Sequence, residues 1–116
     1  MKNFLAIYTG SQESRAKWQG LSDAERKKRE AAGIEAWINW GKKNSAAIVE
    51  QGTPLGKTKR ASPKGITDIK NAMTAYAIVR AESHAAAAKI FENHPHFTIF
   101  PGDSVEIMEC LPLPVR

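Results

Sequence analysis

The chain has 116 residues, of which 42% are hydrophobic and 25% charged, and this length suits one domain with a single core. The composition excludes a mostly disordered chain, which would be poorer in apolar residues. No apolar run reaches the roughly 18 residues that cross a bilayer, and the N-terminus turns polar too soon for a signal peptide, so we expect one cytoplasmic domain, residues 1–116, that binds no membrane.

The first predicted element is a strand at residues 4–9, where nearly every position is apolar. Phe4 and Tyr8 point to one side of this strand, whereas Leu5 and Ile7 point to the other. A strand with one face in water would alternate apolar and polar residues instead. We therefore expect something to cover each face of the sheet.

A helix is predicted at residues 22–44. Ser22 and Glu25 form a capping box, in which the serine hydroxyl accepts from the Glu25 amide and the glutamate side chain reaches back to the Ser22 amide. Apolar residues then recur at helical spacing, and the stripe expected to face the core comprises Ala31, Ile34, Trp37, Ile38 and Gly41.

Three more strands and a second helix are predicted after residue 44. The strands are residues 46–51, 73–81 and 105–111, and the helix is residues 85–92. Ser83 is the N-cap of this helix, and Pro95 disfavours the helical conformation at His94, so the helix ends there. A long polar loop, punctuated by glycine and proline, joins the first two of these strands.

The predicted order β-α-β-β-α-β is that of an α+β, ferredoxin-like fold. In this fold both helices pack on one face of a four-stranded antiparallel sheet. The other face is left open, although its residues are also apolar in this chain. A second copy of the sheet packed against it is the economical solution, so we expect a homodimer.

The candidate catalytic residues are His94, His96 and Asp103. The two histidines flank Pro95 where a helix must end, and the aspartate precedes the last strand. Histidine exchanges protons near neutral pH, and a carboxylate that accepts from one ring nitrogen would fix the tautomer. The alternative is structural, with a cationic His94 capping the carbonyls at the end of the helix and His96 in a loop.

Other chemistry is less well supported by the sequence. Six acidic or imidazole groups match no metal motif in their spacing, namely His84, His94, His96, Asp103, Glu106 and Glu109. Nucleotide-binding glycine patterns are absent, so we expect neither a metal nor a cofactor. The single cysteine, Cys110, excludes an intrachain disulfide and is expected to be a small buried group in the last strand.

Two basic runs account for much of the formal charge of +5. Residues 26–29 are expected to form a solvated helix face, because acidic residues flank them. The second run lies in the polar loop and comprises Lys57, Lys59, Arg60 and Lys64. It is a candidate anion site, with Lys57 as a ligand contact, but few aromatic residues accompany it, so nucleic-acid binding is not expected.

The segments at residues 47–55, 76–83, 94–96 and 102–107 resemble those of the YCII-related, DGPF-like family of the dimeric α/β-barrel superfamily. They read AIVEQGTPL, YAIVRAES, HPH and GDSVEI, and the likeness covers nearly the whole chain. The resemblance implies a dimeric α/β barrel built from ferredoxin-like subunits. Most members have no assigned activity, and a few are tied to the breakdown of hydroxylated, chlorinated aromatic rings.

Members of that family with a proposed active site pair a histidine on the first helix with an aspartate just before the proline. This chain has no histidine around residues 33–36, and His94 occupies the position before Pro95. The resemblance therefore does not extend to this histidine–aspartate pair. Glu35 with His94 is a conceivable rearranged pair, and Glu35 is included among the candidate ligand contacts.

The leading functional hypothesis is a binder, or an enzyme, of a small aromatic or anionic metabolite. Its cleft would lie near the His-Pro-His segment, with Tyr8 and Trp37 as further ligand contacts beside the core positions that such residues also favour. The alternative is a dimeric interaction or regulatory module without catalysis, which the missing pair favours.

Overall fold

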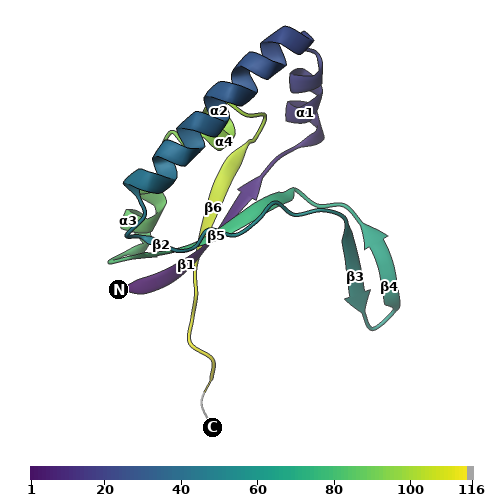
Figure 1. The fold of residues 1–116 in the computed structure, drawn as a ribbon. Helices are drawn as coiled ribbons and strands as arrows, with labels where there is room; N and C mark the ends of the chain where they lie inside the picture. Colours follow the sequence, from purple (N-terminus) through teal and green to yellow (C-terminus); the bar gives the residue numbers. More distant parts are fainter. Residues whose placement is uncertain (115–116) are drawn as a thin grey trace.

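The computed structural model describes residues 1–114, and the elements follow one another in the order shown in Figure 1. They are β1 (Lys2–Thr9), α1 (Gln12–Gln19), α2 (Asp23–Lys43), β2 (Ile48–Glu50), β3 (Thr58–Ser62), β4 (Gly65–Ile69), β5 (Met73–Ala81), α3 (His84–Lys89), α4 (Pro95–Thr98) and β6 (Ser104–Glu109). None of the helices in residues 1–114 combines the length and the apolar content needed to cross a bilayer.

The main sheet has the strand order β2-β5-β1-β6, and all its neighbouring strands are antiparallel. Helix α2 connects β1 to β2, and α3 and α4 lie between β5 and β6. The predicted ferredoxin-like arrangement is therefore confirmed. The central strands of this sheet are β1 and β5.

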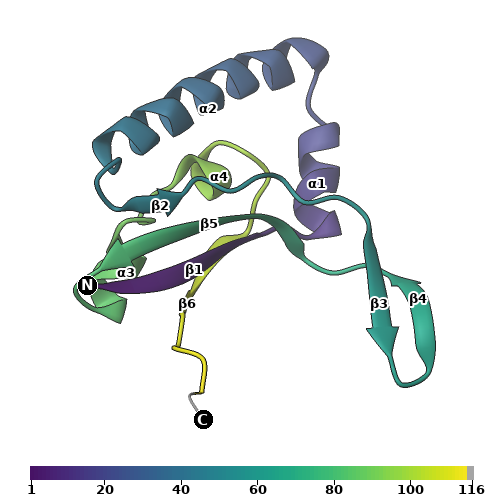
Figure 2. The same cartoon turned by 60° about the horizontal axis from the view of Figure 1, so that its bottom comes forward.

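The core lies between the sheet and the helices. Phe4, Ala6 and Tyr8 of β1 are buried, and Ala77 and Val79 of β5 lie on the same face through the antiparallel register. Trp37 and Trp40 of α2, and Phe91 after α3, pack against these strand residues. This face of the sheet is the one on which α2 lies in Figure 2.

The starts of α2 and α3 follow from the predicted caps, whereas α3 ends at Lys89, before the predicted end at residue 92, and Pro95 begins α4. The Ser22 hydroxyl accepts from the Glu25 amide at 3.1 Å, and the Ser83 hydroxyl accepts from the Ala86 amide at the same distance. The backbone of His94 is extended, with ψ of 141°, as the following proline requires. Each cap satisfies an amide that the helix leaves without a partner.

Four elements were not predicted, namely α1, β3, β4 and the single turn α4. Helix α1, capped by Ser11, has Ala16 and Trp18 as its only apolar residues, so its sequence carries little helical periodicity. The polar loop prediction for residues 57–64 is wrong, because this region belongs to the β3–β4 hairpin. The strands read TKRAS and GITDI, which are too short and too polar to distinguish a strand from a loop, and Gly65 adopts φ of 108° at the turn.

Three other expectations are also wrong in detail. Cys110 is exposed, because β6 ends at Glu109. Ile34 and Ile38 are exposed on α2 as well, since the helix turns Gly33 and its tryptophans toward the sheet. A Cβ on Gly33 would lie 2.5 Å from ring carbons of Phe100, so a residue without a side chain allows this close contact.

The second face of the sheet is apolar and only partly buried. Leu5 is paired in register with Ile78 on one side and Met108 on the other, and Ile7 is paired with Tyr76. Paired residues share a face, so these five side chains form one patch, which we call the open face. Met108 is 44% exposed there, whereas Phe4 and Ala6 on the helix side are nearly inaccessible.

The β3–β4 hairpin projects away from the sheet in both views (Figures 1 and 2). The radius of gyration is 16.3 Å. A compact chain of 100 residues would have about 13 Å. An isolated two-stranded hairpin is at best marginally stable in water, so this arm is suited to a partner.

Candidate functional site

An aromatic cluster surrounds Tyr8 of β1. The Trp37 ring of α2 is stacked on the Tyr8 ring with centroids 5.2 Å apart and planes at 19°. His94 and His96 each approach Tyr8 edge-on, also at 5.2 Å. The His94 ring lies 4.5 Å from each of the Trp37 and Trp40 rings. The fold thus gathers the two histidines and the two predicted aromatic contacts in one place.

The hydrogen bonds of His94 define its tautomer. Its Nδ1 accepts the backbone N–H of His96 at 3.0 Å, which makes His94 the N-cap of α4. Nδ1 therefore carries no proton, and the proton of the neutral ring is on Nε2, 3.5 Å from the Tyr8 hydroxyl. The predicted alternative of a cationic His94 capping the preceding helix is wrong, because the side chain accepts at the start of the next helix.

Burial keeps both imidazoles neutral. Desolvation, and secondarily the proximity of His96, lowers the pKa of His94 to about 4. Burial also lowers the pKa of His96, although the Thr9 carbonyl and the Asp103 carboxylate act in the opposite direction. His94 has no exposed surface and His96 is 8% exposed. A ligand therefore contacts these two imidazoles only through a neighbouring side chain.

His96 is held by the backbone. Its Nε2 donates to the Thr9 carbonyl at 2.7 Å, and its own carbonyl accepts from the Gly102 amide at 2.9 Å. A Cβ on Gly102 would lie 2.2 Å from Nε2 of His96, so the imidazole occupies the space of a side chain at this position. The carbonyl of Thr9 thus fixes the His96 tautomer. From the sequence we expected a carboxylate to have this role.

Asp103 lies at the edge of this cluster and is exposed. Its carboxylate accepts from the Ser14 hydroxyl, and its amide donates to the Thr9 carbonyl at 2.9 Å. The Ser14 hydrogen bond, followed by one from Ser11, lowers the pKa of Asp103. Within residues 1–114 the carboxylate makes no hydrogen bond to either imidazole, so its influence on His96 is through charge.

A cleft of about 270 Å³ opens beside Tyr8. Its walls come from β1, α2, β5 and the segment after β2, and the lining residues are Tyr8, Trp37, Gln51, Gly52, Thr53, Pro54, Ala75 and Tyr76. We call it the Tyr8 cleft. Gly52 adopts φ of 73°, and a Cβ there would lie 1.7 Å from the Tyr76 carbonyl oxygen, so the segment approaches β5 as closely as glycine allows.

The remaining predicted contacts lie elsewhere. Glu35 is exposed on α2. Lys57 lines a different hollow at the base of the hairpin, together with Arg15 and Lys70. Residues 51–54, which form one wall of the Tyr8 cleft, were not predicted as ligand contacts, and the only sequence signal for them is the glycine and proline that end β2. In the described part of the chain, no three His, Cys, Asp or Glu side chains gather as a metal site would require.

The sequence matches no protein-family model and no curated protein sequence closely enough to show a family. A solved structure does match, that of 5-chloro-2-hydroxyhydroquinone dehydrochlorinase from Burkholderia phenoliruptrix in complex with 2,5-dihydroxybenzoquinone. The two chains superpose with a TM-score of 0.53 and are 18% identical, over 90% of this chain and 89% of the other. This chain shares that fold. The likeness agrees with the predicted ferredoxin-like fold, and at this identity it shows the fold alone.

Proposed function

We propose that this protein is a YCII-related homodimer that binds a small, planar, hydroxylated compound in the Tyr8 cleft. The observation that carries the proposal is the combination of an aromatic wall with one buried hydroxyl whose hydrogen-bond direction is fixed by its neighbours. Most small-molecule sites are concave and apolar, with a few polar groups that set the orientation of the ligand. The Tyr8 cleft has this composition.

The Tyr8 hydroxyl is the central polar group of the proposed site. Burial raises the pKa of Tyr8 well above its ordinary value, so the phenol is neutral. The proton on Nε2 of His94 points to the Tyr8 oxygen, since Nδ1 is already occupied as an acceptor. The proton of Tyr8 is then available to a carbonyl or hydroxyl oxygen of a ligand. Trp37 supplies the apolar surface that a planar ring requires.

The same hydrogen bonds favour binding over proton transfer at His94. A neutral His94 that gave up its Nε2 proton would become an imidazolate, and a proton gained at Nδ1 would break the bond from the His96 amide. In this proposal His94 and His96 position Tyr8. The catalytic role expected for His94, His96 and Asp103 stays a prediction.

The ligand class is supported by the similar solved structure, which carries 2,5-dihydroxybenzoquinone. That compound is planar and has oxygen atoms around its ring, so it could both accept from the Tyr8 hydroxyl and lie against an indole. The cleft volume of about 270 Å³ suits a molecule of one ring. We therefore choose it as the probe for this site.

Replacing Tyr8 by phenylalanine is expected to weaken binding of 2,5-dihydroxybenzoquinone about tenfold. A hydrogen bond of this kind contributes about 1 kcal/mol, and its loss leaves the ligand oxygen without its partner. Isothermal titration calorimetry measures the change. The comparison variant is Tyr76→Phe, which removes the hydroxyl of another lining residue; because that hydroxyl donates to Glu50 at 2.8 Å, its loss should change the affinity less. Equal affinities for wild type and Tyr8→Phe would refute the role of this hydroxyl.

The homodimer is proposed to form through the open face. The double substitution Leu5→Glu/Ile7→Glu places two charges in a patch that the dimer would remove from water, so the protein is expected to become monomeric. Sedimentation velocity gives the mass of each form. Ile34→Glu is the control, because Ile34 is 51% exposed on α2, on the other side of the sheet. A wild-type protein with the mass of one chain would contradict the proposal.

A further inference from the structure

Helix α1 forms a second cavity, separate from the Tyr8 cleft, of about 220 Å³. It faces the first half of α2 and the segment at residues 99–102. Ser14, Lys17 and Trp18 line it from α1, where their spacing places all three on one side of the helix, and Leu21 lines it from the segment after α1. Arg29 of α2 and Phe100 also line it. We call this the α1–α2 cavity.

The side chains that line the α1–α2 cavity carry a net positive charge. Lys17 and Arg29 both line it, and in residues 1–114 no carboxylate side chain does. Within the same residues Lys17 makes no ion pair, and Arg29 contacts only Glu25, through Nε at 3.5 Å. Asp103, the residue after Gly102, accepts from the Ser14 hydroxyl, and this bond lowers the pKa of the carboxyl, so one negative charge lies at the edge of the cavity. Two cations along a concave surface still favour an anionic occupant.

Aromatic rings form the apolar part of the same cavity. The Trp18 and Phe100 rings have centroids 6.0 Å apart and planes inclined at 39°. Phe100 is fixed from behind, because it packs on Gly33 and meets the Trp37 ring at 6.0 Å. Trp18 is half-buried, so part of its surface is free for contact. Rings held in this way suit a planar apolar group.

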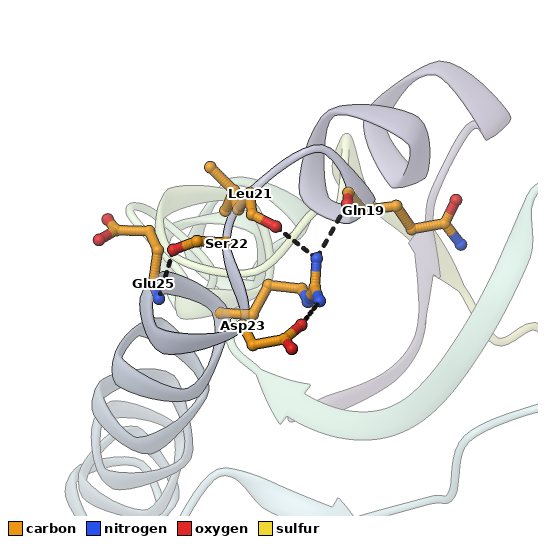
Figure 3. Close-up of polar contacts among 6 residues, drawn as sticks. Gln19, Leu21, Ser22, Asp23 and Glu25 are labelled. Carbon is orange, nitrogen blue, oxygen red and sulfur yellow. Dashed lines mark hydrogen bonds and ion pairs between the residues drawn. The ribbon is translucent and has the colours of Figure 1, made fainter.

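The angle between α1 and α2 is set by Arg26. Its guanidinium donates to the carbonyls of Gln19 and Leu21 at the end of α1 and pairs with Asp23 in the first turn of α2, as Figure 3 shows. The Leu21 amide also donates to the Trp18 carbonyl at 3.1 Å. The two walls are thereby held before any ligand arrives, which lowers the entropic cost of binding.

We propose that the α1–α2 cavity is a binding site for a small aromatic carboxylate. Lys17 and Arg29 bind the carboxylate, and Trp18 and Phe100 contact the ring. Arginine is suited to this role, since its planar guanidinium matches the two oxygens of a carboxylate. The volume limits the ligand to a single ring. This site is independent of the Tyr8 cleft and of the ligand proposed there.

Benzoate is the probe that tests the proposal, with benzamide as its uncharged counterpart. Calorimetric titration of the whole protein is expected to show that benzoate binds and that Lys17→Gln and Arg29→Gln each weaken it at least tenfold. Lys27→Gln is the matched control, because Lys27 is an exposed lysine of α2 that does not line the cavity, and it should leave the affinity unchanged. Trp18 fluorescence, assigned with Trp18→Phe, should change on binding.

Four results would overturn the proposal. Three of them are that benzamide binds as tightly as benzoate, that Lys17→Gln and Arg29→Gln both bind benzoate like the wild type, or that benzoate fails to bind at millimolar concentration. Weakening by Tyr8→Phe, with no effect of Arg29→Gln, would place benzoate in the Tyr8 cleft and would also refute this site. Circular dichroism of each variant checks that the fold is retained.

Discussion

Lowering the pH from 7 to 4 is expected to cost the protein about 3 kcal/mol of unfolding free energy through His94 alone. The pKa of this imidazole is about 4 in the folded protein and 6.5 as the ordinary value. Between these values the unfolded chain binds a proton that the folded chain does not. The stability is therefore full above pH 6.5, falls as the pH drops toward 4, and levels off below it.

Urea unfolding at a series of pH values measures this loss. His94→Asn is the informative variant, because asparagine can still accept the His96 amide as an N-cap but has no charge to gain. Its stability should be lower at pH 7 but should depend less on pH between 7 and 4. A wild-type stability that is constant over this range would show that His94 is not held neutral by burial.

Replacing Gly52 by alanine is expected to destabilise the protein by about 3 kcal/mol and to abolish binding in the Tyr8 cleft. The residue has φ of 73°, which a residue with a side chain adopts at a cost. Its Cβ would also lie 1.7 Å from the Tyr76 carbonyl oxygen, so the segment after β2 must move away from β5. That movement displaces one wall of the cleft.

Gly56→Ala is the matched control for this substitution. Gly56 lies four residues away, and a Cβ there meets no atom of the described residues within 4 Å. Gly56→Ala should change the free energy of unfolding, measured by urea denaturation, by less than about 1 kcal/mol. If Gly52→Ala and Gly56→Ala unfold at the same denaturant concentration and bind the probe equally, the close approach of this segment to β5 is not needed for the cleft.

The sequence was most informative where a local signal and the fold agree. The capping box at Ser22 located the start of α2, and the strand predicted at residues 73–81 has the bounds of β5. Helix α1 and the hairpin at residues 58–69 could not be found in this way, because most of their residues are polar. Helix α1 owes its position to contacts such as that of Ser14 with Asp103, which joins residues far apart in the sequence.

The candidate site was predictable in its side chains but not in its backbone. The His-Pro-His segment and the aromatic residues Tyr8 and Trp37 stand out in the sequence, and they meet in the structure. The partner of His96 is the Thr9 carbonyl, and a backbone group has no signature in a sequence. The contact between His96 and the Thr9 carbonyl depends on where β1 ends relative to α4. The wall at residues 51–54 likewise depends on the register of β2 against β5.

A crystal structure of the protein with 2,5-dihydroxybenzoquinone tests the central claim most directly. The account predicts density for one ring between Trp37 and residues 51–54, with a ring oxygen within hydrogen-bonding distance of the Tyr8 hydroxyl. Density for the compound in the α1–α2 cavity, or a Tyr8 cleft that stays empty at saturating concentration, would contradict it.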